Sequence, residues 1–111
     1  MFTKTISPAE VLQAIQAGEP QDIIDIRDKA SYAVRHIPGA ISNPADGFDA
    51  GMFSSIPADT PIVISCYHGV MSKQVVPYLE SQGFTNVASM KGGMDGWLKL
   101  PNAPVEQTVE Q

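Results

Sequence analysis

The sequence is poor in cysteine: it holds a single one, Cys66, among 111 residues. One cysteine cannot form an intramolecular disulfide, a thiolate zinc site or a C-x-x-C redox pair. Chains that do without disulfides suit a reducing compartment, so we expect a cytoplasmic protein.

Basic residues and long apolar runs are also scarce. Seven Lys and Arg stand against twelve Asp and Glu, which gives a formal net charge of −5 with no basic run to offset it. The overall field therefore repels nucleic acid and anionic membranes. No long apolar stretch follows Met1, so we expect neither a signal peptide nor a membrane span. At 43% apolar and 17% charged residues, the chain is typical of one soluble globular domain with a modest core.

Strand and helix signals alternate along the chain. Apolar runs predict strands at residues 22–27, 40–43, 61–65 and 86–90. Helices are expected from Pro8 to Gly18, at 28–35, briefly within 44–60, at 73–82 around Pro77, and after 91–93. The first of these helices begins with a capping box, in which Ser7 is followed three residues later by Glu10. This order predicts an α/β fold, with a mainly parallel sheet covered by helices on both faces. We expect residues 1–100 to form the domain, and residues 101–111 to form a polar, frayed tail.

Cys66 lies at the junction between a strand and a turn. The apolar run 61–65 leads into it, and the turn 67–72 and a helical pattern follow. Backbone N–H groups of such a turn, and of the helix start behind it, favour negative charge. The turn should therefore lower the pKa of the Cys66 thiol and make it a nucleophile. The alternative is a small buried apolar side chain without a chemical role.

Three segments together resemble the rhodanese family. Residues 25–28 followed by 36–40 (Asp-Ile-Arg-Asp, then His-Ile-Pro-Gly-Ala) are similar to its first signature. Residues 92–97 (Gly-Gly-Met-Asp-Gly-Trp) are similar to the second, and residues 66–72 align with the active-site loop between them. The motifs span nearly the whole chain in the family's order. The resemblance implies a single domain with a five-stranded α/β sheet flanked by helices.

The resemblance also implies a sulfurtransferase that works in two steps. Cys66 would take the outer sulfur of thiosulfate as a persulfide, then pass it to cyanide or to a thiol acceptor such as thioredoxin. One thiol suffices, because no resolving cysteine is needed, and no metal or organic cofactor is required. The substrate-binding candidates are the other loop residues, Tyr67, His68, Gly69, Val70, Met71 and Ser72. The supporting candidates are Asp25, Arg27, Lys73, Gly92 and Gly93.

Several of these residues have a structural reading beside the functional one. Asp25 and Arg27 are expected to form a buried, mutually paired brace. Ser72 is expected either to cap the following helix or to turn its hydroxyl toward the pocket. His68 is either a proton donor or anion contact, or a solvated loop residue. Lys73 either attracts anions or points into solvent.

The glycines at 92 and 93 should let the last turn approach the Cys66 turn closely. Trp97 is expected in the core.

The sequence departs from the family pattern at three positions. Met71 stands where many relatives carry arginine, threonine or serine, so a side-chain donor for thiosulfate is missing. Arg35 replaces a glycine, and Pro77 interrupts a helix pattern. The first departure bears on substrate choice, and the other two on local structure.

Two other functions stay open at this stage. A cysteine phosphatase or arsenate reductase would need an arginine six residues after the cysteine to grip its oxyanion, and that position is Ser72. A non-catalytic sulfur-binding, sensing or persulfide-carrier module would be compatible with Met71. The sequence leaves the physiological sulfur donor and acceptor open, and also the oligomeric state.

Overall fold

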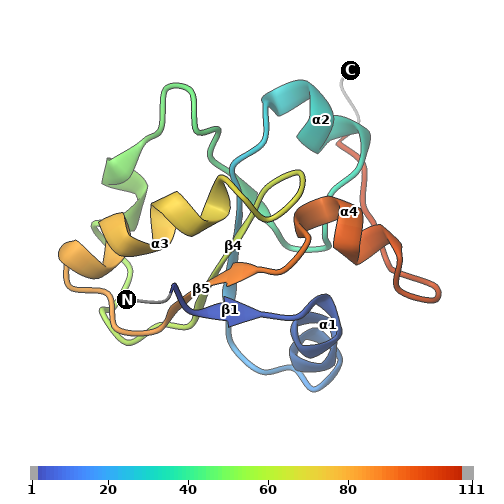
Figure 1. Ribbon diagram of the computed structural model, residues 1–111, viewed down its shortest axis with the longest axis horizontal. Coiled ribbons are helices and arrows are strands. Elements are labelled where there is room, and N and C mark those ends of the chain that lie inside the picture. Colours follow the sequence, from blue (N-terminus) through green and yellow to red (C-terminus); the bar gives the residue numbers. More distant parts are fainter. Residues whose placement is uncertain (1–2, 109–111) are drawn as a thin grey trace.

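The structure is a computed structural model and describes residues 3–108 (Figure 1). Its strands are β1 (Thr5–Ile6), β2 (Asp22–Asp25), β3 (Ile41–Ser42), β4 (Ile62–Ser65) and β5 (Val87–Met90). Its helices are α1 (Pro8–Gln16), α2 (Lys29–Val34), α3 (Ser72–Ser81) and α4 (Gly93–Leu98), with a short 3-10 helix, η1 (Ala50–Phe53). None of the helices in this part of the chain is long and apolar enough to cross a membrane.

The five strands form one sheet in the order β1-β5-β4-β2-β3. Every neighbouring pair is parallel, as between Ile24 and Ile64 at the centre. The α/β class and the five-stranded sheet are therefore confirmed. The apolar runs of the sequence indicated the other four strands but not β1, because Thr5–Ile6 is too short to show a period. β1 exists because it pairs with the edge of β5.

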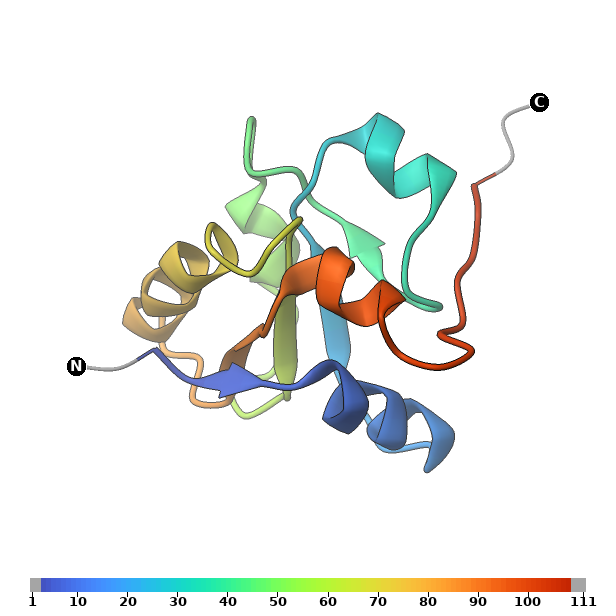
Figure 2. The same ribbon diagram turned by 45° about the vertical axis from the view of Figure 1, so that its right-hand side comes forward.

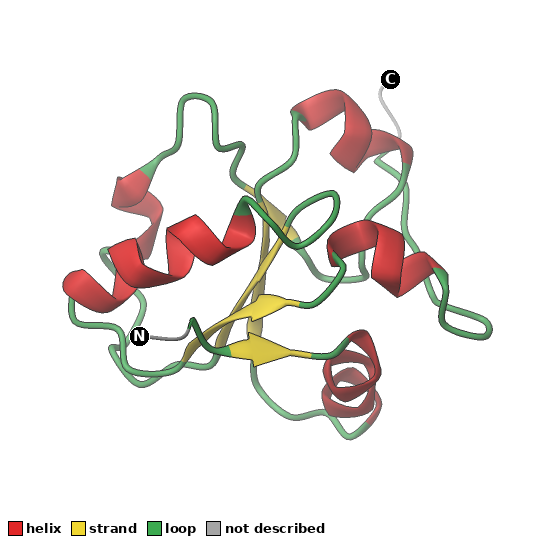
Figure 3. Ribbon diagram, viewed as in Figure 1, coloured by secondary structure: helices red, strands yellow, loops and turns green. Residues whose placement is uncertain are grey.

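Helices cover both faces of the sheet (Figures 1 and 3). On one face, α3 and η1 cover Ile24 and Ile64. On the other, α1 and α4 pack over Ile23 and Val63, and Figure 2 shows both helices on that side. Adjacent strand residues point to opposite faces of the sheet, so each apolar run contributes side chains to both cores. Trp97 is fully buried in the second core, as expected.

The capping box at the start of α1 is confirmed. Ser7 Oγ accepts a hydrogen bond from the Glu10 N–H at 3.1 Å, and the Glu10 carboxylate accepts from the Ser7 N–H at 3.3 Å. Pro77 lies inside α3, as the sequence indicated. Its ring faces the exposed side of that helix, where water can satisfy the carbonyl group that loses its partner.

The expectation of a frayed tail after residue 100 is wrong for the residues described. Trp97 Nε1 donates to Pro104 O at 2.9 Å, so the buried indole N–H has a partner outside its own helix. Glu106 forms a two-bond antiparallel bridge with His36, and the Thr108 N–H donates to Ala33 O at 3.0 Å. These long-range bonds attach the tail to α4, to α2 and to the segment that follows α2, and composition alone gives no sign of them.

Candidate active site

Cys66 follows β4 directly, at the carboxyl end of a central strand of the sheet. In parallel α/β sheets this edge is where sites form. The segment from Cys66 to Met71, here called the Cys66 loop, curls back over the thiol before α3 begins. The Gly69 N–H lies 3.2 Å from Cys66 Sγ, and the Ser72 N–H lies 3.4 Å from it. Gly69 has a φ of +84°, which a residue with a side chain rarely adopts. The backbone of this loop thus points its donors at one sulfur atom.

Two buried serine hydroxyl groups form a short chain that begins at the thiol. Ser72 Oγ lies 3.3 Å from Cys66 Sγ and 2.6 Å from Ser89 Oγ, and both serines are fully buried. The prediction that Ser72 caps α3 is therefore wrong, since α3 begins after Met71 without a side-chain cap. The Ser72 hydroxyl turns inward because the thiol and Ser89 offer partners there. Ser89 comes from β5 and had no signal in the sequence, where it reads as an ordinary strand residue.

Opposing effects set the pKa of the Cys66 thiol. Burial raises the pKa, because a thiolate loses hydration in the interior. Hydrogen bonds from the Ser72 hydroxyl and from the N–H groups of Ser72, Gly69 and His68 lower it, and together they outweigh burial. The net pKa lies below the ordinary value of a thiol, in the direction that the sequence indicated. The site therefore favours the nucleophilic form of the sulfur.

We expect the alkylation rate of Cys66 to rise at lower pH than that of a free thiol. The thiolate is the reactive form, so a lowered pKa moves the midpoint of the rate profile below about 8.5. Ser72→Ala should raise this midpoint because it removes a donor to the sulfur. Ser65→Ala is the matched control, since Ser65 is as buried and its hydroxyl has no hydrogen-bond partner among the residues that the structure describes. A wild-type midpoint at or above that of a free thiol would contradict the proposed role of the loop.

The start of α4 holds the Cys66 loop from behind. The Met94 N–H donates to Cys66 O at 2.7 Å, and the Asp95 N–H donates to Tyr67 O at 3.0 Å. A Cβ atom on Gly93 would lie 2.4 Å from Cys66 O, and one on Gly69 would lie 2.7 Å from Gly92 N. The expected close approach at Gly92 and Gly93 is confirmed. Two glycine-lined backbones are in contact there because neither carries a side chain.

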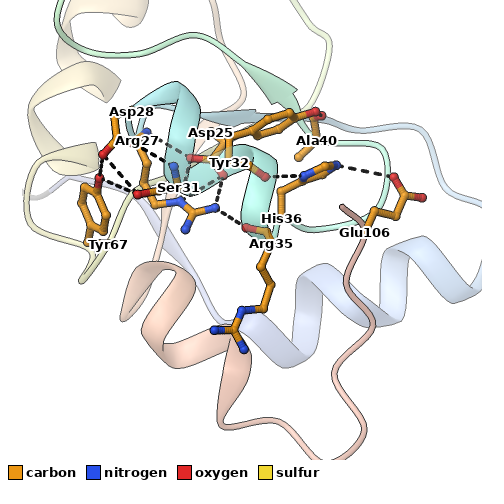
Figure 4. Close-up of polar contacts among 10 residues, drawn as sticks. All are labelled: Asp25, Arg27, Asp28, Ser31, Tyr32, Arg35, His36, Ala40, Tyr67 and Glu106. Atoms are coloured by element: carbon orange, nitrogen blue, oxygen red, sulfur yellow. Dashed lines mark hydrogen bonds and ion pairs between the residues drawn. The ribbon is translucent and has the colours of Figure 1, made fainter. Parts of the chain in front are cut away.

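A buried ion pair braces the other side of the site. Arg27 Nη2 lies 2.8 Å from Asp25 Oδ2 and donates to Arg35 O at 2.6 Å (Figure 4). Both members of the pair are buried, so the expected structural brace is confirmed. Because a buried charge is costly without its partner, losing either residue should disturb this edge of the sheet. The Arg27 guanidinium also lies 5.8 Å from the centre of the Tyr67 ring.

Tyr67 connects the Cys66 loop to α2. Its hydroxyl donates to Asp28 Oδ2 and lies 3.2 Å from Ser31 Oγ (Figure 4). Asp28 is itself the N-cap of α2, accepting from the Ser31 N–H at 2.8 Å. The Tyr67 hydrogen bond is the main cause that lowers the pKa of Asp28. Sequence reasoning missed both partners, because 36 or more residues separate them from Tyr67.

A cavity of about 270 Å³ opens above the thiol. It is lined by Cys66, Tyr67, His68, Val70, Met71 and Gln74. Met71 is 48% exposed and lines this cavity, whereas Lys73 is exposed and does not. The His68 ring is largely exposed, with Nδ1 3.7 Å from Asp95 Oδ2 on the surface. Apart from His68, no side chain lining the cavity can bring positive charge to a substrate.

A buried, activated thiol in a backbone loop at the carboxyl edge of this sheet defines a known class of domain. The rhodanese-like domain family model matches residues 7–100, and the chain belongs to that family. The sequence resemblance is thereby confirmed.

The relatives it resembles are small proteins of similar length. Thiosulfate sulfurtransferase GlpE of Haemophilus influenzae is 38% identical over 109 residues, covering 97% of this chain and 99% of its own. The GlpE protein of Pseudoalteromonas translucida is 40% identical, covering 96% and 100%. The crystal structure of a rhodanese-like domain protein from Staphylococcus aureus has a TM-score of 0.82 at 28% identity, covering 96% and 100%.

Proposed function

We propose that this chain is a thiosulfate sulfurtransferase in which Cys66 carries the transferred sulfur. The observation that carries the proposal is the position of its single thiol. Cys66 is buried and lines a cavity, the N–H groups of Gly69 and Ser72 are directed at its Sγ, and the Ser72 hydroxyl lies 3.3 Å from Sγ. The names of the full-length relatives support thiosulfate as the donor.

In the first step, the Cys66 thiolate attacks the outer sulfur of thiosulfate. A new S–S bond forms at Cys66, the sulfur–sulfur bond of thiosulfate breaks, and sulfite leaves with that electron pair. The product is a Cys66 persulfide, whose negative charge moves outward by one S–S bond of about 2.05 Å. The N–H groups of the loop stabilise this charge in the way that an oxyanion hole stabilises oxygen.

In the second step, an acceptor attacks the outer sulfur of the persulfide. Cyanide would leave as thiocyanate, and a thiolate would leave as a new persulfide, while Cys66 regains its electron pair as a thiolate. No general base is needed once both nucleophiles are ionised. We propose cyanide or a thiol, such as that of thioredoxin, as acceptors.

Intact-protein mass spectrometry tests the proposal. Exposure to thiosulfate should add the mass of one sulfur atom, and a reductant should remove it. Cyanide added to the loaded protein should release thiocyanate. Loading without any release would instead favour a sulfur-binding or carrier module. Absence of any added sulfur would contradict both readings.

Met71 should limit the affinity for the thiosulfate dianion. Its thioether cannot supply a charged donor, and it lines the cavity over the thiol. Met71→Arg should therefore lower KM for thiosulfate, by roughly tenfold for a hydrogen bond to a charged group. Steady-state kinetics with cyanide as acceptor measures this, and Met71→Ala serves as the control that should change KM little. An unchanged or raised KM in a folded Met71→Arg protein would show that this side chain does not reach the donor.

A further inference from the structure

A second hollow adjoins the cavity over Cys66. It has a volume of about 340 Å³ and lies along the exposed side of α3. We call it the side groove, and it is lined by Ala45, Phe48, Met71, Gln74, Val75 and Tyr78. Met71 and Gln74 line both hollows, so the side groove begins where the cavity over the thiol ends. Figure 3 shows α3 and η1 on the same side of the sheet, and the groove lies between α3 and the loop that leads to η1.

The lining of the side groove is aromatic and aliphatic. Phe48 and Tyr78 meet edge to face, with ring centres 6.2 Å apart, and Tyr78 remains 42% exposed. None of the six lining residues is acidic, basic or histidine. Thiosulfate, sulfite and cyanide have no apolar part to place in such a groove. A substrate with an apolar part could place its reacting end in the cavity over the thiol and its apolar end in the side groove. The combined volume of the two hollows is typical of small-molecule sites.

Charge around the two hollows disfavours an anionic substituent. Asp28 and Asp46 line a third hollow that also borders Met71, and Asp95 lies beside His68. Among residues 3–108, Lys29 is the one basic residue that lines the third hollow. Removing a carboxylate from water into an uncharged groove is costly without a partner, so an uncharged substituent fits best.

We propose that the side groove binds the hydrocarbon substituent of a small, uncharged organic thiol, which is the sulfur acceptor of the Cys66 persulfide. This inference rests on the proposed function. The thiolate of the acceptor attacks the outer sulfur, the bond between the two sulfurs of the persulfide breaks, and Cys66 leaves as a thiolate. The acceptor departs as an organic persulfide, so atoms and charge balance without an added oxidant or reductant.

The persulfide geometry favours the acceptor over the donor as the occupant. An outer sulfur about 2 Å beyond Sγ would lie in the cavity that Cys66 lines. This cavity shares Met71 and Gln74 with the side groove. An acceptor that approaches from the mouth can lay its substituent against Phe48 and Tyr78. The departing part of thiosulfate is an inorganic dianion, which the groove cannot hold.

The test measures the rate at which thiols remove sulfur from the loaded protein. Cys66 is loaded with polysulfide and desalted, so that the acceptor step is measured whether or not thiosulfate is a donor. Loss of the added sulfur is followed by intact mass with 2-mercaptoethanol, 6-mercapto-1-hexanol and 6-mercaptohexanoate at equal thiolate concentration. We expect mercaptohexanol to react roughly tenfold faster than mercaptoethanol, because its extra methylenes are buried. Mercaptohexanoate should gain little.

Two variants and one control connect this preference to the side groove. Tyr78→Ser should reduce the advantage of mercaptohexanol over mercaptoethanol by severalfold. Val34→Ser removes an exposed side chain that lies on α2, outside the groove, and should keep the advantage. Gln74→Lys should raise the rate with mercaptohexanoate relative to mercaptohexanol, a change of preference that loss of folding cannot produce.

Rates independent of chain length in the wild type would overturn the inference, as would an advantage that Tyr78→Ser leaves intact. Either result would mean that the side groove does not bind the substituent of the acceptor thiol. Failure to load from thiosulfate, with the thiol preference present after polysulfide loading, would count against thiosulfate as donor and not against the side groove.

Discussion

Cys66→Ser is expected to abolish sulfur loading and to reduce thiocyanate formation to the uncatalysed level. Cys66 is the single thiol of the chain, and a serine hydroxyl in its place cannot form a persulfide. The fold should persist, because serine is close in size and keeps the partners Gly69 N–H and Ser72 Oγ. Intact mass after thiosulfate exposure and a thiocyanate assay measure the two effects.

A variant with a displaced thiol tests whether loading requires only a cysteine or a cysteine at position 66. Ser65→Cys combined with Cys66→Ser retains one cysteine but moves it one residue back along β4. Neighbouring strand residues point to opposite faces, so this thiol leaves the N–H groups of the Cys66 loop. It should not load from thiosulfate. Thiocyanate production by Cys66→Ser alone would end the proposal that Cys66 carries the sulfur.

The parts of the site that lie close together in sequence could be predicted. The run 61–65, the turn after it and the helix behind it are contiguous, so Cys66 at the end of a central strand followed from hydrophobic pattern and turn chemistry. The lowered pKa of Cys66 followed as well, because backbone N–H groups of the same turn contribute to it, although the largest lowering cause is the Ser72 hydroxyl. Asp25 and Arg27 are two residues apart, and their pairing was foreseen for the same reason.

What could not be predicted depends on residues distant in sequence. Ser72 was compatible with a helix cap or with a hydroxyl that faces the pocket. Its partner Ser89, 17 residues later on another strand, favours the second arrangement and could not be read from the local sequence. Tyr67 donates a hydrogen bond to Asp28, which lies 39 residues earlier in the sequence, at the start of α2. Glu106 in the tail pairs with His36 through backbone hydrogen bonds, which do not depend on the identity of the side chains. In each case the partner that determined the outcome lay far away along the chain.

Gly93→Ala is expected to destabilise the protein and to displace the Cys66 loop. The new Cβ would lie 2.4 Å from Cys66 O and 2.7 Å from the carbonyl carbon of Tyr67. These are backbone atoms that cannot rotate aside, and Gly93 also has a φ of +57°. Strain and overpacking together should lower the free energy of unfolding by about 2–5 kcal/mol. Urea unfolding measures this loss as a lower midpoint, and we expect the m-value to stay the same as in the wild type.

Gly18→Ala is the matched control for backbone strain alone. Gly18 has a φ of +70°, but a Cβ there would meet no atom within 4 Å. It should cost about 1–2 kcal/mol and leave the pH profile of Cys66 alkylation unchanged. In Gly93→Ala that profile should move to higher pH, because the contact that Gly93 permits also holds Cys66 O against the Met94 N–H at 2.7 Å. Once the loop shifts, its N–H groups no longer converge on the sulfur. If Gly93→Ala matched Gly18→Ala in both stability and alkylation profile, the contact between α4 and the Cys66 loop would not be what holds the sulfur site in place.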